Sequence, residues 1–138
     1  SNQSAKMESA PARARPLADE EFTGKVLDLV GNAAVLGQLK KGANEATKAL
    51  NRGIAELIIL AADTQPLEIL LHLPLLCEDK NVPYLYVSSK ADLGKSCGTT
   101  RNVVAAAVIK MKDSKLNKTI NKIKDETDRL FIESGNEQ

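Results

Sequence analysis

The apolar run at residues 57–61 constrains the fold more than any other feature of this 138-residue chain. Its sequence, LIILA, is the kind of short continuous run expected of a strand that is buried on both faces of a sheet. Segments with helical spacing lie on both sides of it, and helices that alternate with strands cover both faces of a sheet. The chain is therefore predicted to be an α/β protein, a single-domain three-layer α-β-α sandwich around a small mixed sheet.

The other elements are predicted from apolar spacing and end signals. Asp19 is a suitable N-cap for a first helix, and Gly53 is a suitable C-cap for a second. A third should begin at Pro66 and bend near Pro74, because proline suits a first helical turn and disrupts later ones. The remaining predictions are a loop or very short strand at 37–42, strands at 84–87 and 103–109, a short helix at 90–95 and a last helix across 116–130.

The two ends of the chain are predicted to lie outside the folded domain, which spans residues 17–133. Residues 1–16 have no apolar period and contain two prolines, as is typical of a disordered tail. The six residues before Met7 are read as a cloning remnant or as the sign of a missing natural start. Residues 134–138 are expected to be a disordered C-terminus.

Composition excludes several classes of function. The net charge of +1 argues against a general polyanion binder, and 3% aromatic residues argue against base stacking on an aromatic platform. Cys77 and Cys97 are isolated, so neither a metal site nor a disulfide framework is expected. No apolar run has the ~20 residues of a membrane span. These features indicate a soluble intracellular protein without metal or cofactor.

Catalytic motifs are also missing from the sequence. The triplet GKS at residues 94–96 resembles the end of a phosphate-binding loop, but the first glycine of that motif would fall at Ser89. His72 is the only histidine and lies in a leucine-rich helical segment, so no nucleophile, base and orienting group can be assembled. We therefore expect no enzymatic activity.

A cluster of polar residues begins the predicted second helix, after the glycine of the sequence KGANEATK at residues 41–48. Asn44, Glu45 and Lys48 are spaced so that their side chains are neighbours at a helix end with unpaired N–H groups. A carboxylate there is suited to accept hydrogen bonds from a guanine edge, with Asn44 and Lys48 on base acceptors or phosphates. The alternative reading is a capped helix with an i,i+3 ion pair.

Three loops are expected to converge near this helix, at residues 42–48, 61–69 and 88–101, because ligands usually bind at strand ends in open α/β sheets. The lysines of the last helix, by contrast, read as a solvated face rather than an RNA site. An RNA site in this chain would have to be local and would use hydrogen bonds and aliphatic contacts.

Several motifs resemble the kink-turn RNA-binding protein family, whose ribosomal members share its fold. They are KGANEATK at residues 41–48, LNRG at 50–53, AAD at 61–63 and PLEILLHLPLLCEDKNVPY at 66–84. The resemblance covers roughly residues 16–132. Within the family it is greatest to the eukaryotic branch shared by the U4 small nuclear RNP and the box C/D small nucleolar RNPs.

The resemblance implies a role for each matching residue. Gly42 would let the backbone approach RNA closely, and the polar cluster would read tandem sheared G·A pairs beside the kink. Ile69, Lys90 and Val104 match positions that enclose the extruded nucleotide, and Arg101 matches a loop contact. The full set of expected RNA-binding residues is Lys41, Gly42, Asn44, Glu45, Lys48, Arg52, Gln65, Ile69, Lys90, Thr99, Arg101 and Val104.

Two departures from the family pattern bear on RNA preference. Gln65 stands where relatives often carry glutamate, so an acceptor becomes an amide. The sequence TTRN at residues 99–102 replaces a commoner VSRP, and the missing proline frees that loop. Residues 84–94 also resemble the H/ACA member of the family.

The resemblance implies a non-catalytic RNA-binding protein, monomeric without RNA, that stabilises kink-turns in U4 snRNA and box C/D snoRNA in the nucleus and nucleolus. RNP assembly proteins would dock on the protein and RNA together, for pre-mRNA splicing and rRNA processing. The alternatives are an H/ACA or ribosomal member of the family and a protein-interaction module without specific RNA binding.

Overall fold

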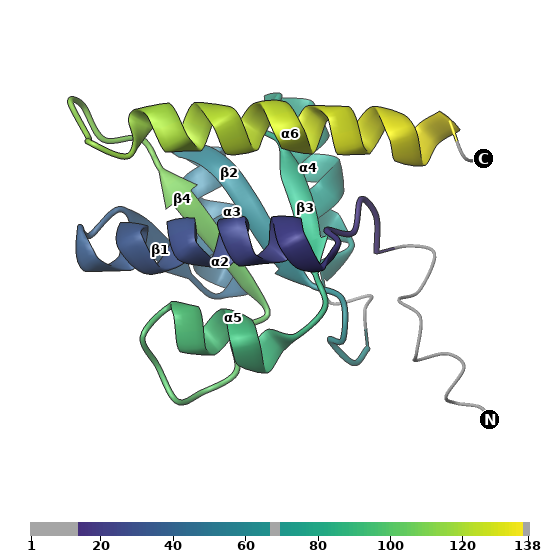
Figure 1. Ribbon diagram of the computed structural model, residues 1–138, viewed down its shortest axis with the longest axis horizontal. Helices are drawn as coiled ribbons and strands as arrows, with labels where there is room; N and C mark the ends of the chain where they lie inside the picture. Colours follow the sequence, from purple (N-terminus) through teal and green to yellow (C-terminus); the bar gives the residue numbers. More distant parts are fainter. Residues whose placement is uncertain (1–13, 67–69, 137–138) are drawn as a thin grey trace.

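The computed structural model describes residues 14–66 and 70–136 (Figure 1). None of the helices in these two ranges is long and apolar enough to cross a bilayer. The elements follow one another in the order α2 (Glu20–Val35), β1 (Leu39–Lys41), α3 (Ala43–Asn51), β2 (Ala55–Ala61), α4 (His72–Lys80), β3 (Tyr84–Val87), α5 (Lys90–Ser96), β4 (Ala105–Ile109) and α6 (Asn117–Asn136).

The four strands form one mixed sheet in the order β1-β4-β2-β3. Strands β2 and β3 are parallel, whereas β4 runs antiparallel to both β1 and β2. The predicted α/β fold with a small mixed sheet is confirmed. Strand β2 lies inside the sheet, as its apolar run indicated, and residues 57–61 are all fully buried.

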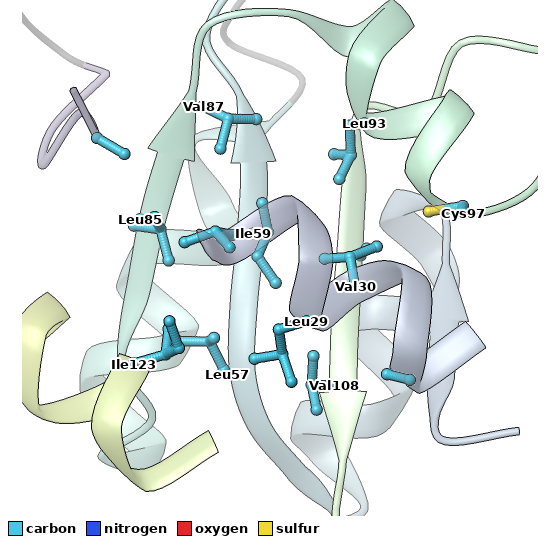
Figure 2. Close-up of a cluster of buried hydrophobic side chains, with 14 of the residues drawn as sticks. Leu29, Val30, Leu57, Ile59, Leu85, Val87, Leu93, Cys97, Val108 and Ile123 are labelled. Atoms are coloured by element: carbon cyan, nitrogen blue, oxygen red, sulfur yellow. The ribbon is translucent and has the colours of Figure 1, made fainter. Parts of the chain in front are cut away.

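Helices cover the two faces of the sheet and enclose two separate cores. Leu57 and Ile59 point into a core formed with α2, α5 and α6, which Figure 2 shows in close-up. Ile58 and Leu60, one residue out of phase, point into the second core with α3 and α4. Successive strand residues face opposite sides of a sheet, so one continuous apolar run supplies both cores. The three-layer arrangement is therefore confirmed.

Helix α4 begins later than predicted. Pro66 does not open it; the helix starts at His72, and Pro74 is its third residue. A proline in the first turn removes an N–H that has no intrahelical partner, so it fits there without the predicted bend. The helix ends at Asn81 in the left-handed conformation (φ 58°), before Pro83, as predicted.

The described structure extends past both predicted limits of the folded domain, at residues 17 and 133. Ala14 and Pro16 are buried, and residues 16 and 18 bond to β3: the Tyr86 N–H donates to the Pro16 carbonyl (2.8 Å) and the Ala18 N–H to the Tyr86 carbonyl (2.9 Å). Strand β3 is an edge strand, whose free backbone groups would otherwise remain unpaired. Residues 1–13 lie outside the described ranges. At the other end, α6 continues to Asn136, beyond the predicted limit at residue 133.

Candidate nucleic-acid interface

Four segments of the chain meet at one edge of the sheet. Strands β1, β2 and β3 end there and β4 begins there, so the segments that follow or precede them emerge side by side. We call this edge, formed by residues 42–48, 61–65, 88–90 and 99–104, the loop edge. Its strand pairs are Lys41 with Ala106, Leu60 with Ala105 and Ala61 with Val87. The predicted convergence of the loops at 42–48, 61–69 and 88–101 is confirmed for their described residues, and the last of them continues through residues 102–104 to β4.

Gly42 connects β1 to α3 in a backbone conformation that suits glycine. Its φ is 104°, which side chains of L-residues rarely allow, and its N–H donates to the Ala105 carbonyl (2.7 Å). Glycine is also the N-cap of α3, so no side chain caps this helix end. The first N–H groups of α3 consequently face the loop edge without a side-chain acceptor, an arrangement that favours negatively charged ligands.

The polar cluster of α3 stands on this helix end. Asn44 and Lys48 are exposed and Glu45 is half-buried. The Lys48 Nζ lies 3.5 Å from the Glu45 Oε2, and the two side chains keep 56% and 46% of their exposure. The alternative prediction is a capped helix with an i,i+3 ion pair. The ion pair is present, but no side chain caps the helix. An exposed pair of this kind contributes little stability, so both groups remain available to a ligand.

Asp63 ties the loop after β2 to the start of α5. Its Oδ1 accepts a hydrogen bond from the Lys90 N–H (2.9 Å), and the Lys90 carbonyl accepts one from the Val103 N–H (3.1 Å). Thr64 turns the same loop back on β2 through a bond from its Oγ1 to the Ala61 carbonyl (2.8 Å). Asp63 was not among the predicted site residues, although the sequence AAD belongs to the family motif.

Gly94 sets the distance between α5 and the loop that carries Arg101. A Cβ on Gly94 would collide with the Arg101 carbonyl oxygen and approach the Val103 nitrogen to 3.3 Å. The Thr99 N–H donates to the Gly94 carbonyl (3.1 Å), and the Arg101 N–H donates to the Thr99 Oγ1 (3.1 Å). The glycine of the GKS triplet therefore serves close packing. It lies inside helix α5, whereas a phosphate-binding loop would place it before a helix.

The remaining expected site residues divide between the two ends of the sheet. Lys41 and Gln65 are exposed at the loop edge and Val104 is half-buried there, whereas Ile69 lies outside the described residues. Arg52 is the C-cap of α3 and so stands at the opposite end of that helix, about 12 Å from its first turn. The structure thus does not bring Arg52 to the loop edge.

The thiols and the histidine are not arranged for catalysis. Burial raises the pKa of Cys77 to about 12 and, against a smaller opposing effect of Lys41, also raises the pKa of Cys97. Both thiols therefore stay protonated and unreactive at neutral pH. The His72 Nε2 lies 3.1 Å from the Thr47 Oγ1, which joins α4 to α3. In the described ranges, no three metal-ligating side chains cluster.

Comparisons with known proteins agree with this geometry. The chain is 59% identical to "Small nuclear ribonucleoprotein associated homolog 13" of Caenorhabditis elegans, across 87% of this chain and 94% of that protein. It is 57% identical to the "13 kDa ribonucleoprotein-associated protein" of Saccharomyces cerevisiae, across 90% and 99%. A solved structure, "Giardia lamblia 15.5kD RNA binding protein", superposes with a TM-score of 0.82 at 45% identity and covers 86% of this chain and 97% of that one. Residues 24–118 match the family model, and the chain belongs to the ribosomal protein L7Ae/L30e/S12e/Gadd45 family.

Proposed function

We propose that this protein is a non-catalytic RNA-binding protein that recognises a kink-turn and holds it sharply bent. The observation that carries the proposal is the start of α3, where Asn44 and Glu45 stand in a first turn that no side chain caps and Lys48, three residues after Glu45, pairs with it. The family to which the chain belongs and the names of its relatives support the proposal.

The mixed charge of this cluster favours recognition of bases over attraction to phosphates alone. Guanine presents N–H donors, and the Glu45 carboxylate is an acceptor, whereas Asn44 offers both donors and an acceptor. Lys48 and the uncapped N–H groups are suited to base acceptors or to phosphate. A carboxylate beside phosphate would be unfavourable, whereas a base donor can bond to Glu45 in addition to its Lys48 partner.

The rest of the loop edge is suited to an extruded nucleotide. Lys90 and Val104 are both half-buried at the loop edge, and exposed Gln65 can donate and accept hydrogen bonds. We propose that Ile69 closes this aliphatic site and that Arg101 and Thr99 contact the RNA from the loop before β4. Asp63 and Gly94 hold these segments in place without contacting RNA.

The names of the relatives suggest which RNAs and ribonucleoprotein particles this chain takes part in. The names of the Caenorhabditis and yeast relatives describe ribonucleoprotein-associated proteins. We propose that this chain binds U4 snRNA and box C/D snoRNA in the nucleus and nucleolus. RNP assembly proteins would then dock on the RNA-bound form, which would serve splicing and rRNA processing. The protein is proposed to be monomeric without RNA.

The test is a titration of wild type and Glu45→Ala against a kink-turn RNA and a fully paired duplex at about physiological salt. Wild type should prefer the kink-turn, and Glu45→Ala should lose about 1–3 kcal/mol of binding free energy, a tenfold to more than hundredfold loss of affinity. Asp79→Ala is a matched control, because Asp79 is an exposed carboxylate on α4, away from the loop edge. Circular dichroism checks that all three proteins are folded.

Two results would contradict the proposal. Tight kink-turn binding by folded Glu45→Ala would rule out the proposed guanine contact with Glu45. Equal, weak binding of wild type to both RNAs would favour a protein-interaction module. RNAs recovered with the protein from cells distinguish the U4 and box C/D assignment from an H/ACA or ribosomal one.

A further inference from the structure

A second charged surface lies at the edge of the sheet opposite the loop edge. Residues 110–124 contain six lysines and one aspartate, a net charge of +5 in a chain whose total is +1. This segment leaves the sheet after Ile109, the residue of β4 that pairs with the first residue of β2. Figure 1 shows its loop and the start of α6 on the far side of the sheet from α5. We call Lys110, Lys112, Lys115, Lys118 and Lys122 the lysine edge.

The lysines of this edge are not neutralised by the protein. All five are exposed, and within the described ranges no ion pair joins any of them to a carboxylate. The sixth lysine, Lys124, behaves differently, since its Nζ lies 2.9 Å from the Glu56 Oε1 and both side chains are mostly buried. That pair neutralises Glu56, so exposed Asp113 is the one carboxylate within residues 110–124 set against the five lysines.

A hollow at the same edge adds uncharged hydrogen-bond donors. It has a volume of about 470 Å³ and opens between the loop after β4 and the first two turns of α6. Lys110 and Lys112 line it from the loop and Asn117 and Asn121 from α6, while Glu56 of β2 lines it with its charge paired to Lys124. Lys118 and Lys122 are one helical turn apart, about 6 Å along α6, and so present two charges in a row beside the hollow.

We propose that the lysine edge is a second, sequence-independent binding surface for the phosphate backbone of duplex RNA. Lysine is a point charge suited to phosphate, and amides suit phosphate and sugar oxygens. A protein partner would need an apolar or aromatic anchor, but among the residues lining the hollow only Met111 and buried Ile120 are apolar. The lysines predicted to be a solvated face thus acquire a function.

This surface differs in kind and place from the loop edge. A kink-turn held at one edge of the sheet leaves the other edge free, so the protein could hold a second helical segment of the same particle. Such contacts would follow bulk electrostatics and would weaken steeply with salt, because cations released from RNA drive them.

The test uses the full chain and a labelled 20-base-pair RNA duplex without a kink, titrated at low and at moderate salt. Lys118→Ala/Lys122→Ala should bind the duplex more weakly and lower the slope of log affinity against log salt by about 2, one for each lost phosphate contact. Lys80→Ala/Arg129→Ala is the matched control, because it removes two exposed helical charges outside the lysine edge and changes the net charge equally. Alanine preserves helix propensity in both variants.

A second arm separates this surface from the proposed kink-turn site. One equivalent of unlabelled kink-turn RNA, enough to fill the loop edge only, should leave the duplex bound; displacement at this ratio would place the duplex on the loop edge and overturn the inference. An equal loss of duplex affinity in both double variants would show that only total charge matters, and it would also overturn the inference. So would tighter, Lys118- and Lys122-dependent binding of a polyglutamate peptide than of the duplex. Absence of kink-turn binding would contradict only the proposed function, since duplex binding is measured without it.

Discussion

The loop edge and the lysine edge lie at opposite ends of one sheet and differ in how their charges are held. At the loop edge, Glu45 and Lys48 carry opposite signs, and Asp63 and Gly94 fix the surrounding backbone through a hydrogen bond and a close contact. At the lysine edge, five exposed lysines share one sign and lack carboxylate partners in the described ranges.

This difference shows how one small domain could combine base-specific RNA contacts with sequence-independent contacts to phosphate. Reading a base requires donors and acceptors at fixed positions, which only a braced surface supplies. Holding a phosphate backbone requires only charge at roughly the right spacing, which flexible lysines supply. Four experiments test this comparison. Gly94 and Asp63 test the contacts that hold the loop edge, Cys77 tests the core, and Lys95 tests an exposed charge.

Gly94→Ala should have the largest effect. The added Cβ meets the Arg101 carbonyl, so α5 and the loop before β4 must separate. We expect a loss of about 1–3 kcal/mol in the free energy of unfolding, together with weaker kink-turn binding. Urea denaturation and RNA titration measure the two effects. Gly24→Ala is the control, because nothing lies within 4 Å of its Cβ position in α2 and it should be neutral or stabilising. Equal stability of the two variants would disprove the close contact.

Alkaline pH should destabilise the core that lies between the two edges. The pKa of buried Cys77 is raised from 9.0 to about 12 by burial and by nearby Glu78. Above pH 9 the unfolded thiol releases its proton while the folded one keeps it, so stability falls as pH rises toward 12. The slope from this group is at most about 1.4 kcal/mol per pH unit, and below pH 9 its effect is absent. Urea denaturation at pH 8 and pH 10.5 should show a smaller decrease in Cys77→Ala; an identical decrease would contradict the assignment.

Asp63→Ala should loosen the loop edge without unfolding the protein. It leaves the Lys90 N–H without its acceptor, a loss of about 1 kcal/mol in stability. Kink-turn affinity should fall severalfold, because Lys90 and the loop after β2 are no longer held together. Asp63→Asn keeps an oxygen at the same place and should restore most of the affinity. If Asp63→Ala binds kink-turn RNA as wild type does, the bond does not position the site.

Lys95→Ala should have the smallest effect. Lys95 is exposed in the last turn of α5, and its side chain makes no hydrogen bond or ion pair in the described ranges. Its loss should weaken kink-turn binding slightly at low salt and not at all at high salt. A titration across several salt concentrations measures this, and a salt-independent loss like that of Glu45→Ala would make Lys95 a specific contact.

Much of the fold could be predicted from local patterns. The alternation of helices and strands, the buried run in β2 and the buried face of α2 are present in short windows of sequence, and the structure confirms them. The start of α4 could not be predicted, because Pro66 and Pro74 both fit a first helical turn and only the folded chain selects one. The pairing of residues 16–18 with β3 was also hidden, since it depends on β3 being an edge strand.

The candidate site divides in the same way. Sequence by itself determined that Asn44, Glu45 and Lys48 share one helix end, because their spacing of three and four residues fixes their positions on any α-helix. Only the tertiary structure decided that Arg52 stands away from the loop edge, that Asp63 bonds to Lys90 and that Gly94 packs against Arg101. These relations join residues that are distant in the chain or depend on where a helix lies against the sheet. Local spacing carries no information about either.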